Sequence, residues 1–151
     1  MPERPLHLLF VCTGNACRSQ MAEGWARDLG GERVEARSAG IEAHGLDPRA
    51  VAVMAEAGVD ISAQRSTRLT PEMLEWADLV ITVCGHADEH CPVLPPGRRK
   101  LHWPLRDPAR ARGEETEVTA VFRASRDEIR RRVAMLLGEL DQREGDRDER
   151  G

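Results

Sequence analysis

Apolar residues in this chain follow two alternating patterns: continuous runs of strand length, and runs that recur every three or four positions. Residues 5–11 (PLHLLFV) and 78–84 (DLVITVC) are nearly continuous apolar runs, which are typical of strands buried on both faces of a parallel sheet. Residues 33–40 (RVEARSAG) alternate in polarity, and residues 100–105 (KLHWPL) form a shorter, edge-like run. The pattern therefore predicts four strands.

Helices are predicted between these strands. Apolar residues recur at helical spacing over residues 19–29, before two glycines that would end a helix. Asp47 and Thr70 each precede a proline, the pattern of a capping residue followed by proline at the first helical position. A last amphipathic helix is expected over residues 117–140. Residues 141–151 contain no apolar side chain and are predicted to be a disordered charged tail.

The alternation of strands and helices defines the fold class. It predicts an α/β protein of three layers, with an open parallel sheet between two layers of helices. A chain of 151 residues suits one such domain, and we assign residues 1–140 to it. Ligands of open α/β sheets bind outside the carboxyl ends of the strands. Cys12 and Cys84 follow two predicted strands, so both are expected at the ligand edge.

Composition narrows the partners and the compartment. The formal net charge of −4 argues against nucleic-acid binding through a basic surface. No apolar run approaches the roughly 20 residues that span a bilayer, so no membrane partner is expected. Four cysteines without a secretion signal indicate a reducing compartment and thiols with catalytic, redox or metal-binding roles. We expect a cytoplasmic protein that acts as a monomer.

Residues 11–19 (VCTGNACRS) carry the strongest chemical signal. A strand, a glycine-containing turn and a helix start present backbone N–H groups around one concavity, which favours an anion. The guanidinium of Arg18 can hold two oxygens of a tetrahedral oxyanion, and Ser19 can donate its hydroxyl to Cys12. Cys12 is therefore expected to be a thiolate nucleophile near neutral pH. The oxyanion-binding loop comprises Thr13, Gly14, Asn15, Ala16, Cys17 and Arg18, of which Cys17 is expected to be a bystander thiol.

The loop and the helix after it, VCTGNACRSQMAEGWA, resemble the low-molecular-weight phosphotyrosine phosphatase fold, and more closely its arsenate reductase branch. The resemblance continues through SAGIEAHGLDPRAV, DLVITVCGHADEHCPVLPP, HWPLRDPARA and RASRDEIRRRV, so it covers the chain except its tail. It implies the strand order 2-1-3-4 and no tightly bound cofactor. It also implies that Cys12 is the nucleophile, Arg18 binds the oxyanion and Asp107 is the general acid.

Two further cysteines separate arsenate reduction from phosphate ester hydrolysis. Reduction needs two electrons, which a second thiol supplies by attacking the sulfur of a cysteine–arsenic adduct. Adjacent strands lie about 4.8 Å apart, near the roughly 5.5–6 Å between the Cα atoms of a disulfide, so Cys84 is expected within reach of Cys12. Cys91 would then take over the bond as Cys84–Cys91. The resemblance implies this relay, with arsenate as substrate and thioredoxin as reductant; glutaredoxin and a low-molecular-weight thiol stay open.

Two other functions are open on the sequence alone. A phosphatase would need only the nucleophile, the arginine, the acid and a water molecule. The phosphotyrosine phosphatases that the chain resembles line their entrance with aromatic residues, commonly tyrosines after the proline that follows the acid. This chain has no tyrosine, and DPARARGEE offers no ring to stack on phosphotyrosine. A metal- or metalloid-binding protein would use Cys84, His86, His90 and Cys91, although their spacing is not that of a zinc finger or ribbon. We interpret both histidines as solvent-facing loop residues.

Members of the arsenate reductase branch often hold a potassium ion beneath the loop, and the matching positions here are Asn15, Glu23 and Ser38. The family's Thr-Ser-Asp segment is RST in this chain, residues 65–67, so an aspartate is missing and an arginine is present. We hypothesise that the Arg65 guanidinium pairs with Glu23 in place of the cation and makes the enzyme insensitive to potassium. The alternative is a weak ion site with Arg65 toward solvent.

Overall fold

The sheet has four parallel strands in the order β2-β1-β3-β4. The computed structural model describes residues 4–150, and for residues 142–150 only the course of the backbone. The register of the sheet pairs Val11 of the first strand with Thr82 of the third. The α/β class, the open parallel sheet and the strand order are confirmed. The strands are β1 (Leu6–Cys12), β2 (Val34–Gly40), β3 (Leu79–Thr82) and β4 (Arg99–His102).

Helices begin where the capping signals predicted them. The side chains of Asp47 and Thr70 accept hydrogen bonds from backbone N–H groups in the first turns of α2 and α3, and a proline follows each cap. The helices are α1 (Arg18–Gly30), α2 (Pro48–Glu56), α3 (Pro71–Trp76), α4 (Gly85–His90) and α5 (Glu115–Arg150), with short 3-10 turns η1 (Gly31–Arg33) and η2 (Pro108–Arg110).

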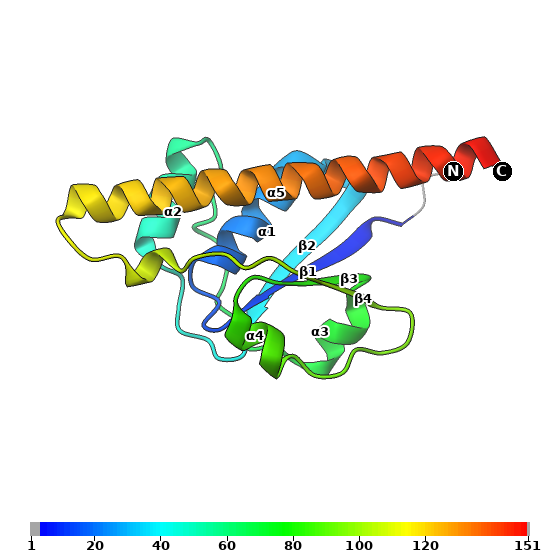
Figure 1. Ribbon diagram of the computed structural model, residues 1–151, viewed down its shortest axis with the longest axis horizontal. Helices are drawn as coiled ribbons and strands as arrows, with labels where there is room; N and C mark the ends of the chain where they lie inside the picture. Colours follow the sequence, from blue (N-terminus) through cyan, green and yellow to red (C-terminus); the bar gives the residue numbers. More distant parts are fainter. Residues whose placement is uncertain (1–3, 151) are drawn as a thin grey trace.

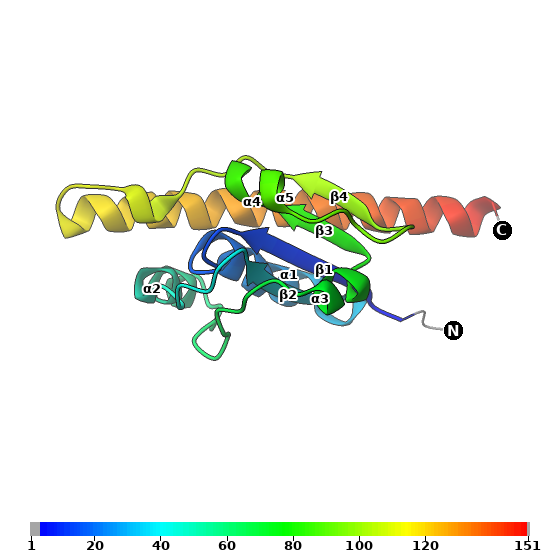
Figure 2. The same cartoon turned by 90° about the horizontal axis from the view of Figure 1, so that it is seen from below.

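Helices cover both faces of the sheet (Figures 1 and 2). α1 and α5 pack together on one face, and α3 and α4 lie on the other. Residues 8–11 of β1 are completely buried, because a central parallel strand is covered on both sides. The loops that follow β1 and β3 therefore meet at the carboxyl edge of the sheet, which positions the site described below.

Helix α5 is longer than predicted. The sequence predicted a disordered tail from residue 141, whereas α5 continues to Arg150 and projects beyond the sheet (Figure 1). Six of residues 141–150 are Arg, Glu or Gln, which are good helix formers, and extending an existing helix needs no new nucleation. Residue 151 lies outside the described residues. Within residues 4–150, no helix is both long and apolar enough to cross a membrane.

The segment between Cys84 and Cys91 is helical, which corrects the expectation of a loop. Cys84 is the N-cap of α4, and its Sγ accepts a hydrogen bond from Ala87 N at 3.3 Å. Cysteine is not among the usual N-cap residues, so the sequence carried no start signal here. Cys84 and Cys91 thus lie at opposite ends of α4, and the imidazoles of His86 and His90 are exposed on this helix.

Candidate active site

The loop of residues 12–18 joins β1 to α1, and its backbone carbonyls are turned outward. Carbonyl oxygens of residues 12, 13, 14 and 16 accept hydrogen bonds of 2.8–3.1 Å from backbone N–H groups of residues 41–47. The opposite side of each peptide group, which carries the N–H, is left to face the centre of the loop. Gly40 permits this close approach, because a Cβ there would overlap the Glu42 carbonyl oxygen and the Asn15 nitrogen. The result is an anion-binding concavity at the start of α1.

The buried sulfur of Cys12 has two hydrogen-bond partners in this concavity. Asn15 N donates to it at 3.1 Å, and Ser19 Oγ lies 2.8 Å away. Asn15 Oδ1 accepts from Thr67 N at 2.8 Å, so Asn15 Nδ2 is the atom that faces Ser19 Oγ, at 2.8 Å, and donates to it. The Ser19 hydroxyl, which accepts from Asn15, therefore donates its proton to the Cys12 sulfur. Two donors aimed at one sulfur stabilise a thiolate, which supports the predicted nucleophile.

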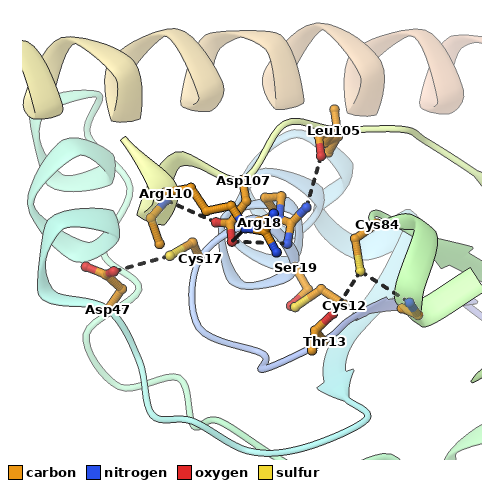
Figure 3. A network of polar contacts seen from close by, with 12 residues as sticks. Cys12, Thr13, Cys17, Arg18, Ser19, Asp47, Cys84, Leu105, Asp107 and Arg110 are labelled. Carbon is orange, nitrogen blue, oxygen red and sulfur yellow. Dashed lines mark hydrogen bonds and ion pairs between the residues drawn. The ribbon is translucent and has the colours of Figure 1, made fainter. Parts of the chain in front are cut away.

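Arg18 and Asp107 meet at the mouth of the loop (Figure 3). Arg18 Nη1 donates to the Leu105 carbonyl oxygen at 2.9 Å, and Nη2 lies 3.6 Å from Asp107 Oδ2. Asp107 also caps η2, because its Oδ1 accepts from Ala109 N at 3.0 Å. The aspartate that the resemblance implies as the acid is therefore fixed beside Arg18. Its side chain is 27% exposed, so it can exchange protons with solvent.

A cleft of about 770 Å³ opens above the loop, and Thr13, Arg18, Cys84 and Asp107 line it. The side chains of residues 106, 110 and 112, all arginines, also line this cleft. They add positive charge around the entrance, which favours an anionic ligand. None of the described residues that line it is Phe, Tyr or Trp. The cleft therefore suits a small oxyanion better than an aromatic phosphate ester.

Cys84 stands beside the loop that carries Cys12. Its Sγ lies 3.2 Å from Thr13 Oγ1 (Figure 3). Since Val11 pairs with Thr82, Cys12 is opposite residue 83, and Cys84 is its diagonal neighbour. Such a diagonal between parallel strands separates Cα atoms by about 6 Å, within the range of a disulfide. Both cysteines are free thiols, and the strand register supports the predicted proximity.

Cys91 is not brought to Cys84. It is half-buried at the far end of α4, and seven residues of helix advance by about 10 Å. Burial raises the pKa of the Cys91 thiol, and the cation of Lys100 partly opposes this shift. In this conformation Cys91 is therefore a protonated thiol out of reach of the cleft.

The thiol of Cys17 is turned toward Asp47. Its Sγ donates to Asp47 Oδ2 at 3.3 Å (Figure 3). Burial, followed by the negative charge of Asp47, raises the pKa of Cys17 far above its ordinary value. Asp47 Oδ1 also accepts from Arg49 N at 2.8 Å, so this carboxylate ties the loop to α2. The geometry agrees with the bystander role expected for Cys17.

The residues matched to a potassium site do not fit a cation. Ser38 Oγ donates to Glu23 Oε1 at 2.7 Å, and Arg27 Nη2 pairs with Glu23 Oε2 at 2.6 Å. Asn15 Oδ1 accepts from Gln20 Nε2 at 3.1 Å. Among the described residues, no buried side-chain oxygen lacks a hydrogen-bond partner. The side-chain oxygens matched to the ion site thus already have partners, and the guanidinium of Arg27 already supplies a positive charge beside Glu23.

The hypothesis that Arg65 replaces the cation by pairing with Glu23 is wrong. Arg65 is exposed, and the carboxylate of Glu23 is paired with Arg27, four residues further along α1, where helical geometry places its neighbour. Burial raises the pKa of Glu23, although Ser38 and Arg27 oppose that shift. Arg65 instead contributes its backbone carbonyl, which accepts a hydrogen bond from Gln20 Nε2.

The alternative of a metal centre lacks a ligand set. His86 and His90 pack against each other with ring centroids 4.2 Å apart. Across the part of the chain that the structure describes, no three His, Cys, Asp or Glu side chains are arranged to hold a metal ion. The four-residue cluster proposed from spacing is divided between the two ends of α4 and its exposed face.

A cysteine in an anion loop after the first parallel strand, with an arginine and a later aspartate, defines a class of cysteine-dependent enzymes that act on tetrahedral oxyanions. Residues 7–146 match the family described as low molecular weight phosphotyrosine protein phosphatase, and the chain belongs to this family.

Relatives in this family have two different activities. An arsenate reductase from Bacillus licheniformis is 54% identical over 126 residues, which are 83% of this chain and 91% of the relative. The structure resembles an arginine phosphatase from Geobacillus stearothermophilus with a TM-score of 0.79 and 29% identity, covering 94% of this chain and 97% of that one. It resembles a thioredoxin-dependent arsenate reductase from Corynebacterium glutamicum with a TM-score of 0.64 and 29% identity, covering 89% of this chain and 65% of that one.

The sequence did not reveal three groups that shape the site. Gln20 and Gln64 order the loop through buried amide contacts, and the Leu105 carbonyl holds Arg18. Neither a glutamine in a helix, such as Gln20, nor one in a loop, such as Gln64, gives a sign in the sequence of where its amide points, and a backbone carbonyl has no signature in the sequence. Only the tertiary contacts identify these groups.

Proposed function

We propose that this protein is an arsenate reductase that converts arsenate to arsenite and serves arsenical resistance. The observation that carries the proposal is the free thiol of Cys84 in the same cleft as Arg18 and next to the loop of Cys12. Hydrolysis of a phosphate ester has no use for a second thiol, because phosphorus is not reduced. Reduction of arsenic(V) requires one.

The first step forms a covalent adduct. Arsenate binds the loop N–H groups and the guanidinium of Arg18, which leaves Asp107 to face the reacting centre. The Cys12 thiolate attacks arsenic and forms a sulfur–arsenic bond. One arsenate hydroxyl group takes a proton from Asp107 and departs as water. Ser19 stabilises the sulfur before the attack and is released when the negative charge on sulfur is consumed.

The second step transfers electrons. The thiolate of Cys84 attacks the Cys12 sulfur and forms a Cys12–Cys84 disulfide, while the electron pair of the sulfur–arsenic bond leaves with arsenic as arsenite. Two thiols are thereby oxidised by two electrons, and arsenic(V) is reduced to arsenic(III). Cys91 then attacks Cys84, which gives a Cys84–Cys91 disulfide and returns Cys12 as a thiolate.

The attack of Cys91 on Cys84 is the third step, and it needs α4 to unwind. Its ends are about 10 Å apart along the helix axis, whereas the Cα atoms of a disulfide lie within about 7 Å. Helix α4 has six residues, and such a short helix has little intrinsic stability. The loss of the hydrogen bond from Ala87 N to the Cys84 sulfur, once that sulfur is in a disulfide, favours the unwinding.

Thioredoxin is proposed as the reductant of the Cys84–Cys91 disulfide. Cys12 is buried, so a protein reductant cannot reach it directly, whereas Cys91 lies in a segment that rearranges. The similarity to a thioredoxin-dependent arsenate reductase supports this assignment. We further propose that the protein works in the cytoplasm as a monomer, since free thiols in a relay depend on a reducing compartment.

One assay tests the proposal. Purified protein, thioredoxin, thioredoxin reductase and NADPH are mixed with arsenate, and p-nitrophenyl phosphate hydrolysis is measured in parallel. Arsenate-dependent NADPH oxidation with slow hydrolysis is expected. Fast hydrolysis without NADPH oxidation would instead establish a phosphatase.

A phosphatase is the second candidate function, because the similarity to the arginine phosphatase covers nearly the whole chain and hydrolysis would use the same Cys12, Arg18 and Asp107. The cleft lined by arginines disfavours a cationic arginine leaving group. We therefore expect hydrolysis only as a slow side reaction of the shared nucleophile.

A further inference from the structure

Gln20 is fully buried in α1 next to the anion loop. Its Nε2 lies 3.0 Å from the Asn15 carbonyl oxygen, 3.1 Å from Asn15 Oδ1 and 3.1 Å from the Arg65 carbonyl oxygen. Oxygens gathered around one point are the usual ligand set of a hard cation. Here an uncharged N–H donor stands at that point.

The orientation of this amide is set by Gln64. Gln64 Nε2 donates to the Gln20 carbonyl oxygen at 3.0 Å and to Gln20 Oε1 at 2.8 Å. Two acceptors in front of one atom identify that atom as the nitrogen of Gln64. Gln20 Oε1 therefore faces Gln64, and Gln20 Nε2 faces the three oxygens.

The contact reaches the nucleophile through Asn15. Asn15 has a φ of 52°, a left-handed conformation that is unfavourable for non-glycine residues unless neighbours hold it. Its side chain accepts from Gln20 and donates to Ser19, and Ser19 is the residue that contacts the Cys12 sulfur. The amide of Gln20, together with the backbone N–H of Thr67, thus sets which way the donors beneath Cys12 point.

We propose that Gln20 is a positioning residue whose amide fills this oxygen cage, so that the loop is ordered for oxyanion binding without potassium. The inference rests on the proposed function only in that the loop binds a tetrahedral oxyanion. It replaces the role first given to Arg65, whose backbone carbonyl is one wall of the cage while its guanidinium is exposed.

The test is phosphate binding, measured by calorimetry at pH 8 in potassium chloride and in choline chloride of equal ionic strength. Gln20→Glu has nearly the same shape but presents an oxygen, in place of N–H groups, to the three oxygens. Gln142→Glu adds the same charge in α5 and is the matched control. We expect the wild type and the control to have one affinity in both salts. Gln20→Glu should bind about tenfold more weakly in choline, the effect of one lost buried hydrogen-bond partner, and recover in potassium.

Four outcomes would overturn the inference. A wild type that binds phosphate only in potassium needs the cation, and a Gln20→Glu variant with wild-type affinity in both salts does not depend on the amide. If Gln20→Glu binds phosphate equally weakly in both salts, potassium cannot take the place of the amide, and Gln20 has only a general structural role. A wild type that binds phosphate in neither salt would overturn the proposed function as well.

A second variant covers the case in which Gln20→Glu does not fold, judged by circular dichroism. Gln64→Ala leaves Gln20 in place but frees its amide to rotate. For this variant we expect a KM for arsenate raised several-fold in choline chloride, a kcat close to that of the wild type, and a KM lowered by potassium. An unchanged KM, or a KM that potassium does not lower, would contradict the positioning role.

Discussion

The hydroxyl oxygen of Thr13 lies 3.2 Å from the sulfur of Cys84. This contact joins the oxyanion loop to the first residue of the segment 84–91, which carries the two relay cysteines. Thr13 follows the nucleophile directly, and Cys84 caps α4. Anion binding and the order of α4 are therefore connected through one pair of side chains. A disulfide between Cys12 and Cys84 disturbs both at once.

Cys12→Ser tests whether one nucleophile serves both activities. We expect arsenate reduction and p-nitrophenyl phosphate hydrolysis each to fall at least about a thousandfold, as is usual when a nucleophile is removed. Phosphate binding, measured by calorimetry, is the control that the loop still forms. Persistence of either activity would refute the shared site.

Cys91→Ser separates chemistry from recycling. One equivalent of arsenite per enzyme is expected, because Cys12 and Cys84 alone supply the two electrons. Continued turnover with thioredoxin should stop, since the variant is trapped as the Cys12–Cys84 disulfide. Arsenite release in single-turnover and steady-state assays distinguishes the two. Multiple turnovers would mean that Cys91 is not the terminal thiol.

Asp107→Asn removes the proposed proton donor and keeps its shape. Adduct formation is expected to slow by about 10²–10³-fold, within the usual contribution of a general acid. Phosphate affinity should be unchanged or higher, because a negative charge 3.6 Å from Arg18 Nη2 is removed. Rapid-quench measurement of arsenite formation and calorimetry of phosphate provide the two readouts, and an undiminished rate would remove Asp107 from the mechanism.

Asp88→Asn should speed the relay. Asp88 Oδ1 lies 2.9 Å from Lys100 Nζ and accepts from Thr82 Oγ1 at 3.0 Å, which ties α4 to β3 and β4. An exposed ion pair contributes only a little stability, so the Cys84–Cys91 disulfide is expected to form up to about fivefold faster. Its formation after one turnover is measured by acid quench and peptide mapping, and a slower rate would contradict a tether on α4.

The same tether gives a pH prediction. Hydrogen bonds from Lys100 and Thr82 lower the pKa of Asp88. A carboxyl whose pKa is lowered by folding contributes stability above its ordinary value, and the contribution is lost only as the pH falls through the lowered value. The relay rate of the wild type should therefore show no dependence on Asp88 between about pH 6 and pH 8.

Cys17 should be the thiol slowest to react in the folded protein. Burial and the charge of Asp47 raise its pKa, so the thiol stays protonated through neutral and mildly alkaline pH. Iodoacetamide labelling followed by mass spectrometry is expected to modify Cys12 first and Cys17 last. Asp47→Asn is the matched variant, in which Cys17 labelling should accelerate, and fast labelling of Cys17 in the wild type would contradict its bystander role.

The sequence by itself determined the α/β class, the four strands and the helix starts at Asp47 and Thr70, because these depend on local periodicity and capping. It also identified the anion loop, since nucleophile, glycine, arginine and serine lie within one short segment. The strand order and the role of Asp107 came from resemblance alone, because residues far apart in sequence carry no local sign of contact.

Only the tertiary structure decided which distant groups complete the site. Long-range packing put Gln20, Gln64 and the Arg65 carbonyl beneath the loop. It left the Arg65 side chain exposed, so Glu23 pairs with Arg27 on its own helix. It also made residues 85–90 a helix that separates Cys84 from Cys91. A one-dimensional pattern records polarity and spacing, whereas hydrogen-bond partners are chosen by the positions of atoms in the folded chain.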